Sequence, residues 1–426
     1  MSHPILTLDV LRAAVARGAA AIRAVTRLEP AGGPGDKVFP PTYVKEGKSS
    51  TKYAMELRNV GGREVQTVLL DSVASQANRM EEALLEGWRR DELSFPVIQV
   101  DFSAQDGLED LERITSLTAP HRIADALLRD SVDAAGVPFR QTSIGKEFAD
   151  SRPNHATKMY KYCPTALVFG VWDSTGPKGG LGAKFQRCVV SEIVGHDVVA
   201  GVKTASRIDP AGIEKKSGTV YEKRGEPGEW TSIEDEAATE KGKPKPFSRK
   251  GGGDKGTPAA INHGNIPPSI DAEAGGVTMS HATHTVVVSL AGLRRLRFQE
   301  DVNGARIPSD ARDQAETAAR TCLAALALAG VAYQRDNGYD LRSRSLLVPA
   351  EPLVFEVLDR DGGDPLRYRL DREGAAKLLS EAVSAATAVG LGWDAAPVTL
   401  TPAPKLAHLI RESRKLAAAG EVEENG

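Results

Sequence analysis

The chain has 426 residues, a formal charge of −3 at pH 7 and only 5% aromatic residues. This length predicts two to three domains and a core that needs no disulfide or metal staples. The near-neutral charge argues against a uniformly basic coat protein for nucleic acid, although it leaves room for local basic patches.

Cysteine usage and hydropathy indicate the cellular compartment in which the protein is expected. The three cysteines, Cys163, Cys188 and Cys322, match no zinc-binding spacing and suggest no disulfide framework. The N-terminus lacks the pattern of a signal peptide, and the most apolar run, residues 321–332, is too short to span a bilayer. We therefore expect a soluble, cytoplasmic protein with reduced thiols and no membrane partner.

The first third of the chain alternates between periodic apolar segments and breaks rich in Gly or Pro. Two strand patterns meet at Gly61-Gly62 and predict a hairpin, after which Asp71 and Ser72 can cap a helix. The predicted elements are a helix at 7–27, a loop at 28–43, strands at 53–58 and 64–70, a helix at 73–86 ended by Gly87, and a helix at 120–130.

The rest of the chain mixes strands and helices without regular alternation. The elements predicted there are strands at 165–173, 188–194, 197–202, 283–290, 345–348 and 353–358, and helices at 310–329 before Gly330, at 371–389 and from Pro404 onward. This order disfavours a doubly wound parallel sheet. It predicts an α+β fold with a split βαβ core of ferredoxin-like or RRM-like type.

Residues 209–276 differ in composition from the rest. Of these 68 residues, 9 are large and apolar and 19 are Gly or Pro, too little apolar surface to offset the entropy of ordering. Their charge is split, because 225–240 holds six acids and no Lys or Arg, whereas 241–255 holds six cations and one Asp. We expect 1–208 and 277–400 to form the main domain, 209–276 to be a flexible insertion, and 401–426 to be a helix with an acidic tail.

Two surfaces carry side chains that suit nucleic-acid backbone. The helix at 73–86 presents Ser75, Gln76, Asn78 and Arg79, which can hydrogen-bond ribose and phosphate. An ordinary solvent-exposed helix face has the same composition, so this alternative stays open. The glycine-rich stretch 176–187 contains three cations and lets a backbone approach phosphate closely, although a plain hairpin turn is equally compatible. It is no Walker A loop, because no Lys-Ser or Lys-Thr closes it.

Metal and catalytic signals are weak. His281 and His284 lie three apart in a predicted strand, where such a pair points to opposite faces. Asp71, Asp173 and Asp209 lie near strand ends, where an acid can serve a metal-dependent nuclease but more often caps a helix or makes a turn. We expect no catalytic residues, no metal and no cofactor.

Several motifs together resemble a known family. They are the stretches Leu28 to Lys37, Phe39 to Tyr43, Leu70 to Glu81 (LDSVASQANRME), His121 to Ala126 (HRIADA) and Phe169 to Ser174 (FGVWDS). They are similar to the CRISPR-associated RAMP-superfamily backbone subunit of type I-G (formerly I-U) Cascade-like effector complexes. The resemblance spans most of the first 210 residues.

This resemblance implies a modified RRM-like palm with an antiparallel sheet and inserted finger and thumb elements. It implies a non-enzymatic subunit, several copies of which line up on one CRISPR RNA (crRNA) and support its pairing with target DNA in antiviral defence. Its implied partners are a large PAM-reading subunit, a fused repeat-processing subunit and a transient helicase-nuclease. Related type III subunits cut RNA with a loop Asp, so a metal-dependent RNA-cleaving RAMP subunit is the alternative, with Asp209 as its candidate.

The resemblance also implies where the RNA lies. The expected RNA-binding residues are Ser75, Gln76, Asn78, Arg79, Lys178, Lys184, Arg187, Lys37 and Arg122. Because base pairing reads the sequence in such complexes, the protein needs only backbone contacts and shape. The low aromatic content suits that mode better than base reading by stacked aromatic residues.

Overall fold

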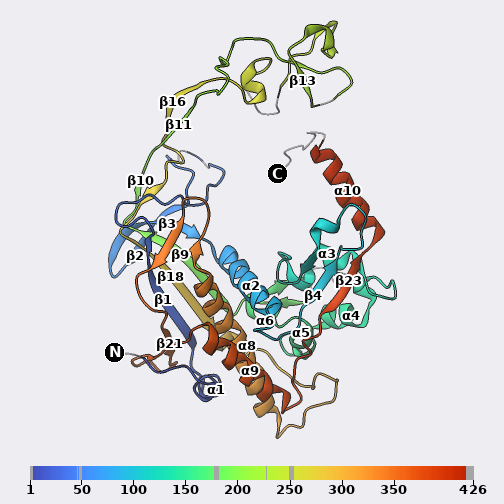
Figure 1. Cartoon of the computed structure of the whole chain (residues 1–426). Coiled ribbons are helices and arrows are strands. Elements are labelled where there is room, and N and C mark those ends of the chain that lie inside the picture. Colours follow the sequence, from blue (N-terminus) through green and yellow to red (C-terminus); the bar gives the residue numbers. More distant parts are fainter. Residues whose placement is uncertain are drawn as a thin grey trace. The chain divides into compact units, whose positions relative to one another are not determined.

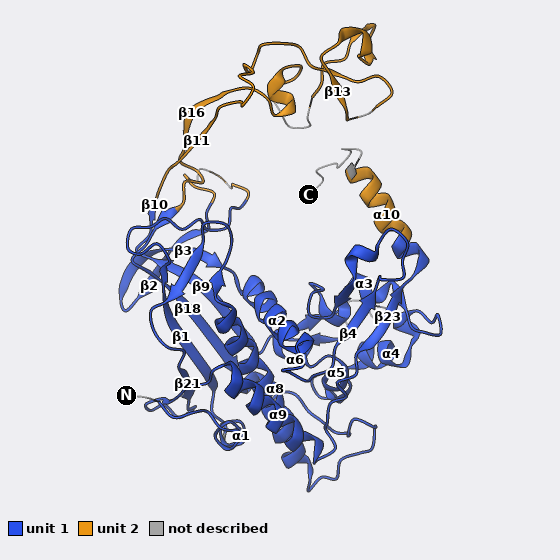
Figure 2. Cartoon of the chain, in the orientation of Figure 1, with its two compact units in different colours: residues 1–43, 53–199, 277–407 blue, residues 44–52, 200–276, 408–426 orange. Residues whose placement is uncertain are grey.

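The computed structural model describes residues 3–45, 47, 50–176, 182–226, 228–248 and 254–418. The chain divides into two compact units (Figure 2). Unit 1 consists of residues 1–43, 53–199 and 277–407, and unit 2 of residues 44–52, 200–276 and 408–426. Helices combine with mainly antiparallel sheets, so the predicted α+β class is confirmed.

Unit 1 is built on a nine-stranded antiparallel sheet (Figure 1). The strands follow the order β19-β20-β1-β18-β9-β3-β2, and β21 pairs with both β1 and β22. Their bounds are β1 Ala21–Pro30, β2 Met55–Val60, β3 Arg63–Asp71, β9 Val189–His196, β18 His281–Ser289, β19 Tyr339–Asp340, β20 Leu346–Pro349, β21 Phe355–Leu358 and β22 Leu366–Tyr368.

Helices cover one face of this sheet, where α2 contacts β9 and α8 contacts β18 (Figure 1). The helices of this layer are α1 Leu8–Arg17, α2 Val73–Arg89, α8 Arg312–Asn337 and α9 Arg372–Thr387. Burial alternates along β18, so His284 is buried beneath the helices while His281, on the other face, is only half-buried. The predicted opposition of these two histidines is confirmed.

Helix α8 is the centre of the unit 1 core. It is long and apolar enough to cross a membrane, the only such helix in the described part of the chain, yet 89% of its most apolar window is buried inside the structure. Burial of this kind is consistent with the core helix of a soluble protein. Its alanines and Gly330 let α2 approach closely, because a Cβ at Gly330 would lie 3.4 Å from both Leu84 Cδ1 and Met80 Cβ.

A smaller sheet completes unit 1, with the order β5-β4-β23-β6. Strand β23 pairs in parallel with β4 although nearly 300 residues separate them. The remaining elements of unit 1 are β4 Ile98–Asp101, β5 Arg113–Thr115, β6 Ser131–Val132, β7 Val171–Trp172, β8 Lys184–Phe185, β17 Val277–Thr278, β23 Val398–Pro402, α3 Ala126–Arg129, α4 Ser143–Asp150, α5 Thr157–Tyr162, α6 Pro164–Phe169, α7 Leu290–Leu293 and the 3-10 turns η1 Glu109–Leu111, η2 Arg122–Ala124 and η3 Phe139–Gln141.

Unit 2 contains short antiparallel pairs and few buried apolar side chains. Strands β11 and β16 form a ribbon that exposes Ile270, and β12 pairs with β13 and β14 with β15. The bounds are β11 Lys203–Arg207, β12 Tyr221–Glu222, β13 Trp230–Thr231, β14 Thr239–Glu240, β15 Lys243–Pro244, β16 Ile266–Asp271, η5 Glu234–Glu236 and η6 Pro258–Ile261. Strand β10 (Val199–Ala200) and helix α10 (Pro404–Ala418) each run across a boundary between the units.

Four predicted elements were wrong. The helix at 7–27 is α1 followed by β1, because Gly18 ends α1 in the left-handed region and β-branched residues follow. The strand at 165–173 is the helix α6 followed by the two-residue β7. The helix at 120–130 is only η2 and α3. The helix at 310–329 continues through Gly330 to Asn337, because this glycine serves packing rather than termination.

Candidate nucleic-acid interface

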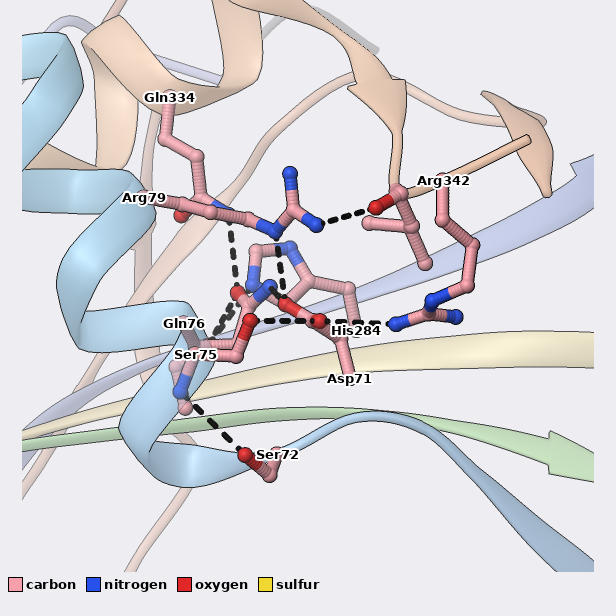
Figure 3. Close-up of polar contacts among 10 residues, drawn as sticks. Asp71, Ser72, Ser75, Gln76, Arg79, His284, Gln334 and Arg342 are labelled. Atoms are coloured by element: carbon pink, nitrogen blue, oxygen red, sulfur yellow. Dashed lines mark hydrogen bonds and ion pairs between the residues drawn. The ribbon is translucent and has the colours of Figure 1, made fainter. Parts of the chain in front are cut away.

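Strand β3 ends in a buried carboxylate around which polar groups converge (Figure 3). Asp71 is 1% exposed and accepts hydrogen bonds from Ser75 Oγ at 2.8 Å, Gln76 Nε2 at 2.6 Å and Arg79 Nε at 2.9 Å. Gln76 and Arg79 share Oδ2, whereas Arg342 Nη2 lies 3.4 Å from Oδ1, the oxygen that also accepts from Ser75. We call Asp71, Ser75, Gln76, Arg79 and Arg342 the Asp71 cluster. Its side chains come from β3, the first turns of α2 and the turn after β19.

The Asp71 cluster is locally cationic, because two guanidinium groups face one carboxylate. Arg79 also donates from Nη2 to the carbonyl of Leu341 at 2.6 Å, which fixes its orientation while 28% of its side chain stays exposed. Burial lowers the pKa of Arg342, and its Nη1 atom has no hydrogen-bond partner among the described residues. The cluster therefore offers fixed, partly exposed guanidinium groups, a geometry that suits phosphate.

The loop before β2 is fastened beside this cluster. Phe39 N donates to the carbonyl of Arg344 at 3.1 Å, and Ser345 Oγ donates to the carbonyl of Phe39 at 2.5 Å. The exposed guanidinium of Arg344 lies over the Phe39 ring, 4.0 Å from its centroid. Lys37 is half-buried on the same loop. The loop thus contributes Lys37, and the segment that carries Arg342 contributes Arg344.

Gln76 supports the site from inside. It is 0% exposed, and its Oε1 atom accepts hydrogen bonds from Ser191 Oγ at 3.0 Å and Gln334 Nε2 at 2.9 Å. Ser191 in turn contacts His284 Nε2 at 2.8 Å, and burial lowers the pKa of that imidazole to about 3. Gln76 therefore joins α2 to β9 and α8 and does not reach the surface in this structure. By contrast, Asn78 is exposed, and Ser75 is half-buried with its hydroxyl bound to Asp71.

Arg122 is also an internal residue. It is 7% exposed and forms a two-pronged ion pair with the buried Glu81, with both N–O distances at 2.6 Å. Its Nη1 atom donates to the carbonyl of Gly170 at 2.9 Å. Burial raises the pKa of Glu81 to about 7, and the paired guanidinium opposes that shift. Arg122 thus holds α2 to the segment after α6 and is not available to a ligand in this structure.

A second cationic surface surrounds a cavity of about 770 Å³ in unit 1. Lys184 and Trp172 are cross-strand neighbours in the β7–β8 pair, and the Lys184 Nζ atom lies 5.0 Å from the Trp172 ring centroid. Arg187 is half-buried and donates to the carbonyl of Val73 at 3.2 Å, at the first residue of α2. Exposed Arg295 donates to Gln186 Oε1 at 2.6 Å. We call this the Trp172 cavity.

The structure brings the expected RNA-binding residues into two groups. Ser75, Gln76 and Arg79 lie in the Asp71 cluster, while Lys184, Arg187 and the internal Arg122 lie at the Trp172 cavity. Lys178 lies outside the described residues. The sequence reasoning missed Trp172, Arg295, Arg342 and Arg344. A signal for the first was present, because a Trp follows Gly170-Val171 in an aromatic-poor chain.

The other two strand-end acids, Asp173 and Asp209, each have their own local partners. Asp173 is 1% exposed and pairs with Arg140 at 2.6 and 2.8 Å. Asp209 accepts from the backbone N–H of Gly264 and of Ala211 and contacts His263 Nδ1 at 3.1 Å, and these contacts, led by Gly264, lower its pKa to about 2. Among the described residues, no group of three His, Cys, Asp or Glu is arranged to hold a metal ion.

Comparison with known proteins agrees with the motifs. Residues 22–200 match the model of the family described as CRISPR-associated protein GSU0053 (Cas_GSU0053). This segment runs from β1 to β10 and contains Asp71, Arg79 and Trp172. No curated protein matches the chain. The family match, which covers less than half of the chain, supports a CRISPR-associated protein.

Proposed function

We propose that this CRISPR-associated chain is a non-enzymatic crRNA-binding backbone subunit of a type I-G Cascade-like complex. The observation that carries the proposal is the Asp71 cluster, because it holds two guanidinium groups, those of Arg79 and Arg342, at the end of β3. Strand β3 and Arg79 lie within the segment that matches the family. A subunit that holds guide RNA by its backbone needs such sequence-independent phosphate contacts.

The strand order supports a RAMP-type, RRM-like palm. In the chain, β1, α2, β9, β18, α8 and β20 come in the order of a β-α-β-β-α-β unit. The β2–β3 hairpin is inserted after β1, and further elements are inserted between the later members of the unit. In the sheet these four strands take the order β20-β1-β18-β9, and each neighbouring pair is antiparallel. The inserted hairpin extends the sheet beside β9.

The proposal includes the assembly. Several copies of the chain lie along one crRNA in the cytoplasm, beside a large PAM-reading subunit and a fused repeat-processing subunit. The guide pairs with target DNA, and a transient helicase-nuclease performs the cutting. The subunit itself needs no metal or cofactor.

Co-purification tests the proposal. The tagged chain, expressed with its neighbouring genes and a repeat array, should carry a small RNA of uniform length and a raised ratio of absorbance at 260 nm to that at 280 nm. Several copies of the chain should be present per RNA by native mass spectrometry. A complex free of RNA would overturn the proposal.

Incubation with RNA and Mg²⁺ separates a binding subunit from an RNA-cleaving one. We expect intact RNA with both the natural chain and the Asp209→Ala variant. Cleavage by the natural chain that is lost in Asp209→Ala would show that the subunit is a metal-dependent nuclease.

A further inference from the structure

The Trp172 cavity combines an exposed aromatic ring with a strongly one-sided charge. Trp172 is 55% exposed, whereas most large aromatic side chains of unit 1 are buried. Lys184, Arg187 and Arg295 line the same cavity together with the buried Arg122, and no described residue that lines it is Asp or Glu. A cavity that is aromatic and cationic suits a ligand with a flat ring and a negative charge.

The local fold holds the ring in place. Gly170 ends α6 with a positive φ of 85°, and a Cβ there would lie 3.0 Å from the backbone N of Arg187. The chain can therefore turn directly into β7 only with glycine at this position. Strand β7 then pairs with β8, which sets Trp172 beside Lys184, and Asp173 is anchored by Arg140. The indole thus projects from a short, fixed strand.

The cations around the ring are suited to phosphate. Arg187 is tied to the start of α2 and Arg295 to Gln186, so each guanidinium is positioned by one hydrogen bond and keeps further N–H groups. Lys184 is exposed, and its ammonium can move from the indole face to a neighbouring phosphate. The ring and these cations line one cavity, whose volume of about 770 Å³ leaves room for a nucleotide.

We propose that the Trp172 cavity is a nucleotide subsite, where one unstacked base of a single-stranded RNA stacks on Trp172 and its phosphates bind Arg187 and Arg295. This inference rests on the proposed RNA-binding function and adds base stacking to contacts with the RNA backbone. Stacking accepts any base, because every base has a π-face. The subsite therefore holds RNA without reading its sequence.

Abasic RNA tests the subsite. The full chain, freed of nucleic acid at high salt, is titrated with a labelled single-stranded RNA of mixed sequence and with the same sugar-phosphate chain lacking its bases. We expect the natural chain to bind the complete RNA more tightly by about 5- to 150-fold, the range for stacking of one base. Trp172→Ala should lose that preference, and Trp172→Phe should keep part of it.

Trp230→Ala is the matched control, because Trp230 is also an exposed indole but belongs to unit 2 and does not line the cavity. The Trp230→Ala variant should keep the preference for complete RNA. Trp172→Ala should also keep the salt dependence of binding, because it removes no charge. Equal binding of the two RNAs by the natural chain, or an unchanged preference in Trp172→Ala, would overturn the subsite alone. Failure of the natural chain to bind either RNA would overturn the RNA-binding function as well.

Discussion

The Nε atom of Arg79 lies 2.9 Å from a carboxylate oxygen of Asp71, so a fully buried acid holds a partly exposed base. The acid cannot contact a ligand, but it fixes the direction of the guanidinium. In the proposed complex with RNA, Arg79 would therefore bind phosphate with little further loss of side-chain freedom. Asp71 would act as the internal anchor and Arg79 as the surface contact.

Replacement of Arg79 tests that surface contact. Arg79→Ala should weaken RNA retention, and the slope of log affinity against log salt should fall by about 0.7 for one lost phosphate contact. Arg79→Lys should retain the charge but lose the planar set of N–H donors of the guanidinium, so RNA retention should recover only in part. Exposed Arg89, at the end of the same helix, supplies the control Arg89→Ala. Retention unchanged in Arg79→Ala across a salt series would remove Arg79 from the interface.

The buried ion pair between Glu81 and Arg122 should be structural. Glu81→Gln leaves the Arg122 guanidinium buried without its counter-charge, so we expect the free energy of unfolding to fall by about 3–5 kcal/mol. Urea denaturation followed by circular dichroism measures the change. The neighbouring exposed acid provides the comparison, and Glu82→Gln should shift the urea midpoint only slightly. Equal effects of the two variants would contradict a buried role for Glu81.

Stability should fall as the pH drops below neutral, because His284 is buried. The pKa of this imidazole is about 3 in the fold and near 6.5 in an unfolded chain, so between these values only the unfolded chain takes up the proton. The contribution is complete above pH 6.5 and is lost progressively toward pH 3, on the order of a few kcal/mol.

Urea midpoints measured from pH 7 to pH 4 check this dependence. His284→Gln should be less stable at pH 7, because Ser191 and Tyr339 lose a partner, but its pH dependence should be flatter. His408→Gln, at an exposed histidine, should follow the natural chain. A slope that is as steep in His284→Gln as in the natural chain would assign the effect to other groups.

Close packing between α2 and α8 depends on Gly87. A Cβ at this position would lie 2.5 Å from Tyr333 Cε1 and 2.8 Å from Leu93 Cδ1, so Gly87→Ala should destabilise the chain by about 1–3 kcal/mol. Thermal unfolding measures this loss. At Gly218, nothing lies within 4 Å of the corresponding Cβ, and Gly218→Ala should have little effect. A melting temperature unchanged by Gly87→Ala would contradict the packing.

Local signals predicted the elements that depend on neighbouring residues. The hairpin of β2 and β3 and the cap of α2 at Ser72 were confirmed, because turn glycines and a capping hydroxyl act within a few positions. The apolar stretch that became α6 could not be assigned by periodicity, because it is buried on every side.

The Asp71 cluster could not be predicted in full from the sequence, because it is formed by contacts between distant parts of the chain. Asp71 meets Arg342 across 271 residues, and Gln76 meets Gln334 across 258. Helix periodicity identified the turns of α2 but could not show that β9 and α8 would enclose Gln76. From the low aromatic content we predicted that the protein contacts only the RNA backbone. Composition could not show that one exposed indole, that of Trp172, lies in a cationic cavity.

The hydrogen bond from Arg187 to the Val73 carbonyl has a geometric consequence. Arg187 is tied to the first residue of α2, and Arg79 projects from the same helix six residues later, about 9 Å along its axis. The helix therefore determines how far Arg79 lies from the point where Arg187 is bound, and the direction in which Arg79 projects from the helix axis. One residue inserted between Val73 and Arg79 would turn Arg79 by about 100° and carry it away from Asp71, although no charge would be lost.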